Sequence, residues 1–140
     1  MKRELVAPCG MNCNVCSSYL ALSSGLPKKK GEINHCEGCL PRGKKCAYLK
    51  GHCNKIADGK LRFCSGCPSF PCERLKTIDA RYRRSYDASL IDNLREIEKT
   101  GIDGFLRKQR NIFKCAKCGG TVSVHNRKCY SCDKIESWRE

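Results

Sequence analysis

The chain has 140 residues, 14 of them cysteine, and a formal net charge of +14 at pH 7. Large aliphatic residues are few for so many charges, a balance that approaches the composition of disordered proteins and excludes a fold held by hydrophobic burial alone. Disulfides or bound metal must therefore supplement the core, and the cysteines are the groups that can provide either.

The apolar residues form no run long enough for a signal peptide or a membrane-spanning helix. We therefore expect a cytoplasmic protein without a membrane partner. In a reducing compartment, closely spaced cysteines serve more often as metal ligands or redox groups than as structural disulfides. The sequence thus favours metal binding over disulfide bonding as the source of additional stability.

Residues 1–76 contain ten of the cysteines, and we predict that they form a cysteine-rich region with several zinc sites. The segment Asn14–Ser24 is predicted to form a helix, because Val15 and Leu20 share one of its faces. Gly25 is expected to end this helix. From residue 28 to residue 70 neither a helical nor a strand period is present, so we expect loops that bound metal holds in place.

Three CxxC pairs in this region are typical of metal-binding turns, in which two thiolates point at one ion. Its candidate ligands are Cys9, Cys13, Cys16, Cys36, Cys39, Cys46, Cys53, Cys64, Cys67 and Cys72. They can be divided as two four-thiolate sites with two cysteines left over, as one such site plus a six-thiolate cluster of two metals, or with histidines completing a third site. His35 and His52 each precede a cysteine directly, so we expect them at the surface or beside a ligand rather than on a metal.

Residues 77–112 contain no cysteine and are predicted to be a helical segment. One helix is expected to begin at Pro71 and to run into this segment. A second is expected between a capping box at Ser89 and a terminating Gly101, and a short third one over residues 103–110. The apolar positions that carry the helical periods are Leu75, Ile78, Tyr82, Leu90, Leu94 and Ile97.

Residues 113–140 hold the strongest motif, which consists of two CxxC pairs separated by ten residues. Its four candidate ligands are Cys115, Cys118, Cys129 and Cys132. Two such turns complete a tetrahedral site, and the alternation of residues 121–125 between them predicts the hairpin of a zinc ribbon. His125 lies in this hairpin, where we expect it to be exposed.

Together these elements predict a small metal-stabilised α+β protein, with a cysteine-rich zinc-knuckle domain, short helices and a C-terminal zinc ribbon. Four-thiolate sites favour zinc, and we expect two to four zinc ions in the chain. An iron–sulfur cluster is the alternative, because thiolates also bind iron. The spacing of Cys9, Cys13 and Cys16 is that of radical S-adenosylmethionine enzymes, but the chain is too short for the barrel that those enzymes require.

Two motifs carry a resemblance to a known family. The first is Cys9 followed by Cys13 and Cys16, and the second runs from Cys64 through the stretch Phe70–Leu75. These motifs resemble the cysteine-rich domain-of-unknown-function family 3795, whose members look like zinc-binding proteins with no assigned reaction. The resemblance therefore implies metal binding and leaves the biological role open.

The sequence shows no set of catalytic residues and no phosphate-binding loop, so we expect a binding module rather than an enzyme. Basic clusters, which include residues 28–30 and 42–45, favour nucleic acid or a ribonucleoprotein as the partner. The arginines chosen as candidate phosphate contacts are spaced three apart on the predicted helices: Arg81, Arg84, Arg107 and Arg110. A protein–protein adaptor that binds no nucleic acid is the alternative, as is an iron–sulfur redox protein.

Overall fold

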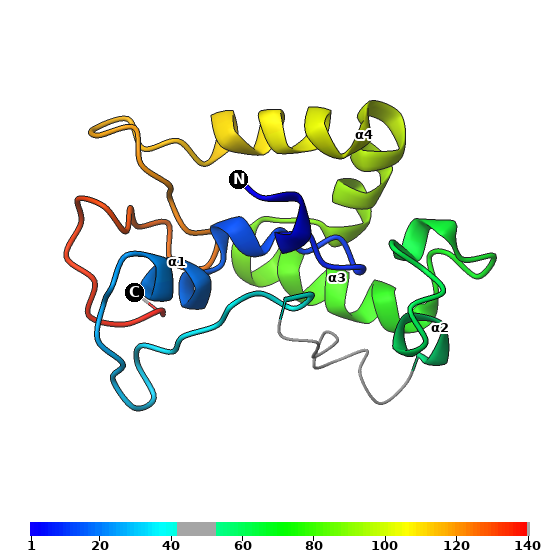
Figure 1. Cartoon of the computed structure of the whole chain (residues 1–140), viewed down its shortest axis with the longest axis horizontal. Helices are drawn as coiled ribbons and strands as arrows, with labels where there is room; N and C mark the ends of the chain where they lie inside the picture. The colour runs from blue at the N-terminus through cyan, green and yellow to red at the C-terminus, as the bar shows by residue number, and fades with distance from the viewer. Residues whose placement is uncertain (42–52, 140) are drawn as a thin grey trace.

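Two helices in the second half of the chain carry most of the regular structure (Figure 1). They are α3, Glu73–Tyr86, and α4, Leu90–Ile112. The computed structural model describes residues 1–41 and 53–139. The shorter elements are the 3-10 helices η1 (Arg3–Leu5), η2 (Cys13–Val15) and η3 (Cys64–Gly66) and the helices α1 (Ser17–Ser23) and α2 (Asn54–Ala57).

The first α-helix is shorter than the one predicted for residues 14–24. Cys16 follows η2 in an extended conformation, with a ψ angle of 132°, so α1 begins only at Ser17. The end of α1 agrees with the prediction, because Gly25 follows with a φ angle of +73°. Glycine adopts such a left-handed backbone without steric cost, and the chain leaves the helix there.

The start of α3 also lies slightly later than predicted. Pro71 is not in the first turn of the helix, because Cys72 is the capping residue and the helix begins at Glu73. The predicted apolar face is present, since Leu75 and Ile78 are both buried. The period of the apolar residues therefore predicted which side of the helix faces the core.

A buried carboxylate in the middle of α3 joins this helix to the start of α4. Asp79 accepts hydrogen bonds from the backbone N–H of Ile91 at 2.9 Å and from the hydroxyl of Ser89 at 2.8 Å. Arg83 Nε donates to the same side chain at 2.7 Å. Ser89 Oγ in turn accepts from the backbone N–H of Asp92 at 3.0 Å, which confirms the predicted cap of α4.

Helix α4 contains a break at Gly101, whose φ and ψ angles of 74° and 168° are not helical. The helix predicted to end at Gly101 and the one predicted over residues 103–110 are therefore the two parts of α4. The buried apolar residues of the two parts are Leu90, Ile91, Leu94, Ile97, Phe105 and Leu106. A left-handed glycine explains why the helical path changes direction at this point.

The N-terminal segment lies between α3 and α4 (Figure 1) and forms the core with them. The largest buried cluster gathers side chains from the N-terminal segment, α2, α3, α4 and the residues that follow: Leu5, Ala7, Cys9, Met11, Cys13, Val15, Ile56, Leu75, Ile78, Leu90, Ile91, Leu94, Phe113 and Val124. Because Val124 belongs to it, the core spans all three predicted parts of the chain. The division into residues 1–76, 77–112 and 113–140 remains a prediction.

Gly10 is the point of closest approach between the N-terminal segment and α4. Its φ angle is +89°, and a Cβ atom there would overlap the backbone carbonyl of Leu90 and lie 2.8 Å from Leu94 Cγ. The Asn93 side chain donates to Gly10 O at 2.9 Å and fixes the contact. Only glycine satisfies both the backbone conformation and the space.

The C-terminal segment pairs with itself through isolated antiparallel bridges, Lys114 with Thr121 and Val122 with Cys129. Within residues 1–41 and 53–139 the structure contains such bridges but no β-strand, so this part of the protein is helix-rich rather than α+β. The predicted strand over residues 121–125 is thus reduced to single bridges at Thr121 and Val122.

Several predicted features lie outside the described residues. These are Cys46, His52 and the basic cluster at residues 42–45. In the ranges that are described, no helix combines the length and the apolar character needed to cross a bilayer.

Candidate metal centre

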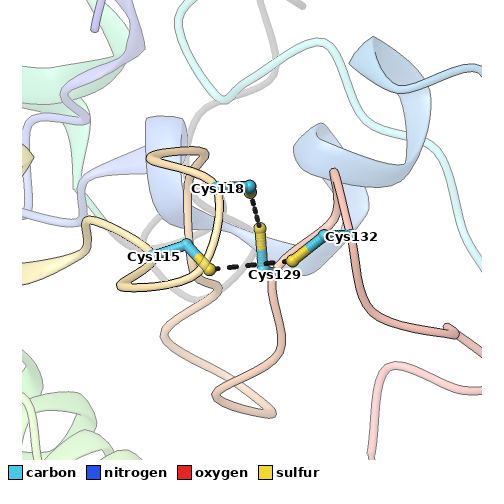
Figure 2. Close-up of side chains that lie close together, drawn as sticks. All are labelled: Cys115, Cys118, Cys129 and Cys132. Carbon is cyan, nitrogen blue, oxygen red and sulfur yellow. Dashed lines mark hydrogen bonds between the residues drawn. The ribbon is translucent and has the colours of Figure 1, made fainter.

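Four cysteines from two turns of the C-terminal segment converge on one point, and we call them the C-terminal cysteine cluster (Figure 2). They are Cys115, Cys118, Cys129 and Cys132. All four sulfur atoms lie within 4.8 Å of one another. Cys115 Sγ and Cys132 Sγ are 3.7 Å apart, and Cys118 Sγ and Cys129 Sγ are 3.6 Å apart. The spacing of the two CxxC pairs in the sequence predicted this convergence.

Backbone hydrogen bonds hold the first turn of the cluster. The Cys115 N–H donates to Gly120 O at 2.8 Å, and the Gly119 N–H donates to Cys115 O at 2.9 Å. Gly119 has a φ angle of +75°, which closes the turn. The Gly120 N–H lies 3.4 Å from Cys118 Sγ and donates to it. The turn therefore points both sulfurs inward and presents the Gly120 N–H to Cys118 Sγ.

Asp133 holds the second turn of the cluster through hydrogen bonds with Cys129. Its carboxylate accepts a hydrogen bond from the Cys129 N–H at 2.8 Å, and the Asp133 N–H donates back to Cys129 O at 3.0 Å. Lys117 Nζ lies 3.2 Å from the same carboxylate and links the second turn to the first. Sequence analysis did not single out Asp133. An aspartate directly after a CxxC pair is the signal that could have identified it.

The thiols of the cluster differ in acidity. The backbone N–H groups of Cys118 and Lys117 point at Cys115 Sγ and lower the pKa of its thiol to about 7. The pKa of Cys132 is raised, first by the neighbouring thiol of Cys118 and then by burial. Crowded thiols oppose one another's ionisation, whereas a divalent cation between them would favour the thiolate form of all four.

The geometry of the cluster fits a tetrahedral metal ion and not a disulfide. Zinc–sulfur bonds of about 2.3 Å place the sulfurs of a tetrahedron about 3.8 Å apart, close to the distances of 3.6 and 3.7 Å found here. A disulfide needs a sulfur separation of about 2.05 Å. None of the thirteen cysteines of the described residues forms a disulfide.

Within residues 1–41 and 53–139, no other group of three or more ligand atoms is packed within 4.8 Å. Two looser gatherings are nevertheless present among the cysteines of residues 1–76, which we call the first-block cysteines. The Cys13 thiol interacts with Cys39 and Cys16, and the Cys16 thiol with Cys36. A cavity of about 460 Å³ at the start of α3 has four further cysteines in its wall: Cys53, Cys64, Cys67 and Cys72.

Cys9 lies in the main core with 1% of its surface exposed.

Two histidines precede first-block cysteines in the sequence, and of these His52 lies outside the described residues. His35 Nε2 lies 2.6 Å from Leu26 O, so its ring donates a hydrogen bond to the backbone carbonyl.

His125 is not the exposed residue that we expected. Its Nδ1 atom lies 3.2 Å from both the backbone nitrogen and the hydroxyl of Ser17. The rings of Tyr82, Tyr86 and Trp138 surround it edge-on, with centroids 6.2, 4.8 and 6.4 Å away. Burial lowers the pKa of His125 to about 4, so its imidazole is neutral at pH 7. Its role is to pack the C-terminal segment against α1.

All four arginines predicted to contact phosphate are exposed, two on α3 and two on α4. Arg110 donates to the backbone carbonyl of Met1 at 3.4 Å. Arg81, Arg84 and Arg107 form no ion pair with any residue of the part of the chain that the structure describes.

The fold and the cysteine cluster define a small, helix-rich, cysteine-rich protein with a candidate metal site. Residues 5–77, just over half of the chain, match the family described as protein of unknown function DUF3795. The chain belongs to this family, which confirms the resemblance seen in the sequence. No curated protein and no solved structure matches the chain. The C-terminal cysteine cluster lies outside the matched residues.

Proposed function

We propose that the protein binds zinc for structural purposes and that the C-terminal cysteine cluster forms a zinc-ribbon site. The observation that carries the proposal is the convergence of four sulfurs within 4.8 Å from two CxxC turns. A divalent ion bound there supplies the positive charge that balances the thiolates. Because four protein ligands fill a tetrahedron, the site leaves no open position for a substrate, and a structural role follows.

Metal analysis of the anaerobically purified chain tests this proposal. We expect zinc, with zinc–sulfur distances of about 2.3 Å in X-ray absorption spectra. Replacing Cys115→Ser together with Cys132→Ser should remove about one zinc ion per chain. Lys117→Ala is the matched control, since it alters the same turn without removing a thiol, and it should leave the zinc content unchanged.

Two results would overturn the zinc assignment. One is near-stoichiometric iron with charge-transfer absorption in the visible region, which would indicate an iron–sulfur protein. The other is an unchanged zinc content in the double variant, which would mean that the cluster is not a ligand set.

A second function, binding of nucleic acid, is supported by the three arginines that lack an ion-pair partner in the described residues. Arg81, Arg84 and Arg107 are exposed, and a cationic side chain without an internal partner can pair with phosphate. The formal net charge of +14 falls when metal-bound cysteines ionise, but the chain remains basic. We propose weak binding with little sequence preference, because phosphate contacts carry no sequence information.

Titration of a fluorescent oligonucleotide over a salt series tests this second function. Binding should be strongest at roughly 50 mM salt and should weaken steeply as salt is added. Reversing all four candidate arginines to glutamate should lower the affinity and flatten the salt dependence, while zinc content stays unchanged. The matched control reverses four other exposed cations, Lys2, Lys60, Lys99 and Lys114, and so gives the same net charge. Equal losses in both variants, or no binding by the wild-type chain, would favour the protein-adaptor alternative.

A further inference from the structure

Two CxxC turns of the first block meet beside the start of α1. Cys13–Val15 forms η2, and the Cys16 N–H donates to Cys13 O at 3.1 Å, which closes the first turn. The Cys36 N–H donates to Ser18 O at 3.1 Å. Ser18 is only two residues from Cys16, so this hydrogen bond holds the second CxxC turn against the first, although about twenty residues separate them in the sequence.

The Cys13 and Cys39 thiols are hydrogen-bonded across this junction. Cys13 interacts with both the side chain and the backbone N–H of Cys39, and its own partner Cys16 lies near both Cys36 and Cys39. These interactions connect all four thiols into one group. Cys13 is buried in the main core, where thiolates without a counter-ion are strongly disfavoured. A divalent cation would remove that penalty.

The second turn shares a local feature with the C-terminal cysteine cluster. The Gly38 N–H donates to Cys36 Sγ at 3.4 Å, as the Gly120 N–H does to Cys118 Sγ at the same distance. In both cases the donor lies two residues after the cysteine and stabilises negative charge on sulfur. Gly38 has a φ angle of +102°, and a Cβ atom there would lie 2.5 Å from Leu5 Cδ2. The turn therefore needs glycine to present its N–H to the sulfur.

We propose that Cys13, Cys16, Cys36 and Cys39 form a second metal centre, which takes one divalent ion of the zinc class. The proposal extends the structural role of metal to a site with entirely different ligands. The four sulfurs are less tightly grouped than those of the C-terminal cluster. Binding of the ion therefore requires them to move together, which rotation about the cysteine χ1 bonds allows.

A different observation, the cavity at the start of α3, points to a third centre. The four cysteines of its wall come from α2's capping position, from both ends of the η3 turn and from the cap of α3. Within this wall Lys55 Nζ donates to Cys67 Sγ at 3.6 Å. The backbone N–H of Ser69 also points at the Cys67 sulfur. We infer that Cys53, Cys64, Cys67 and Cys72 bind a thiolate-ligated metal group in this cavity.

Cadmium NMR of the full chain tests both assignments without any mutation. The protein is reconstituted with ¹¹³Cd²⁺, and proton–cadmium correlations connect each ion to the β-protons of its cysteine ligands. We expect one ion coupled to Cys13, Cys16, Cys36 and Cys39. A second is expected at Cys53, Cys64, Cys67 and Cys72, and a third at the C-terminal cluster. Each site thus gives its own signal, so failure of the C-terminal site and failure of either new centre are distinguishable.

The second centre is overturned if no ion correlates with its four cysteines together, for instance if Cys9 or Cys46 replaces one of them. The same criterion applies to the third centre. Metal analysis of the anaerobically purified chain, compared with that of a variant carrying Cys64→Ser and Cys67→Ser, identifies the native metal of the cavity. Loss of one zinc ion in the variant indicates a single ion, and iron with visible absorption that disappears in the variant indicates an iron–sulfur cluster. Absence of both metals from the wild-type cavity, with no cadmium signal, removes the third centre.

The metal content of cysteine variants gives an independent count of the ions bound per chain. Cys13→Ser with Cys39→Ser should lower the metal content by one ion per chain and leave the cadmium signal of the C-terminal cluster in place. The matched control is Cys9→Ala, which removes a neighbouring buried thiol and should leave the ion count unchanged. A loss of one ion in the control but not in the double variant would assign Cys9 to the site instead.

Discussion

His125 Nδ1 lies 3.2 Å from the backbone nitrogen of Ser17 and accepts its hydrogen bond. The contact joins the C-terminal segment to the first residue of α1, across more than a hundred positions of sequence. A second link lies beside it, because the Val124 N–H donates to Val15 O at 2.9 Å. The segment that carries the C-terminal cysteine cluster is thereby attached to the cysteine-rich N-terminal segment.

We expect the folded protein to lose stability in weak acid, because His125 is neutral in the folded chain. Burial lowers its pKa from 6.5 to about 4 in the folded chain. Between these values the unfolded chain binds a proton that the folded chain does not, so stability falls as the pH drops from 6.5 towards 4. At pH 5 the loss should be about 2 kcal/mol relative to pH 7.5. Urea unfolding of the metal-saturated protein at the two pH values measures it.

His125→Gln separates this effect from metal loss, since glutamine keeps a hydrogen-bond acceptor but does not titrate. The difference in unfolding free energy between wild type and variant should shrink as the pH falls from 7.5 to 5. A difference that stays constant would contradict a neutral, partly buried imidazole.

We expect that removing the single carboxylate of Asp79 lowers the stability of the protein strongly. Its side chain is 4% exposed and accepts hydrogen bonds from Ile91, Ser89 and Arg83. Asp79→Ala leaves buried donors unpaired and should lower the free energy of unfolding by about 3 kcal/mol. Thermal unfolding of the purified variant measures the change.

The control for Asp79 is an exposed carboxylate in an ion pair. Asp103 pairs with Arg3, and their side chains are 59% and 66% exposed. Asp103→Asn should change the stability by less than about 1 kcal/mol, because solvent screens exposed pairs. Equal effects at the two positions would show that Asp79 does not organise the junction of α3 and α4.

Asp79 and Asp103 also show which features of the fold could not be predicted from the sequence. Apolar periods identified the buried faces of α3 and α4, and the pattern at Ser89 identified the cap, because both depend only on neighbouring residues. Nothing local distinguishes Asp79 from an exposed aspartate. Its burial depends on the donors that α4 brings to it, and these become neighbours only when the helices pack.

The cysteines show the same contrast: local spacing predicts how some of them group, whereas the grouping of the others depends on the fold. Those of the C-terminal cluster lie within eighteen consecutive residues, so their spacing alone predicts that they meet. Grouping of the first-block cysteines depends on the path of the chain between the turns, for example on the hydrogen bond that brings Cys36 to Ser18. The sequence therefore left several divisions open. His125 was misjudged for the same reason, since the rings that bury it come from α3 and from the end of the chain.

We expect that one methyl group added at Gly10 disrupts the packing of the N-terminal segment against α4. Gly10→Ala would force a Cβ atom against the carbonyl of Leu90, a backbone atom that cannot move without displacing α4. We expect a loss of about 3 kcal/mol or more in unfolding free energy. Gly25→Ala is the control, because Gly25 also has a positive φ angle but its Cβ would meet nothing within 4 Å.

The control variant should lose about 1 kcal/mol, the cost of a left-handed backbone alone. The excess in Gly10→Ala over Gly25→Ala then measures the steric contact with α4. If chemical denaturation gave the two variants the same stability, the close approach of the N-terminal segment to Leu90 would be wrong.

Removal of the metal should loosen the C-terminal segment first and the start of α1 with it. Without an ion, the crowded thiols of the C-terminal cluster have no counter-charge, and the bridges of this segment are too isolated to hold it. Val124 and His125 then lose their positions, so the N–H groups of Val124 and Ser17 lose their acceptors. Hydrogen exchange before and after treatment with a strong chelator should show faster exchange at both amides. The Ile91 amide, which donates to Asp79 at the junction of the two long helices, provides the internal reference and should exchange more slowly than either. Cys115→Ser with Cys132→Ser should reproduce the result without a chelator. Unchanged protection at Val124 and Ser17 in the metal-free chain would show that packing alone holds the C-terminal segment in place.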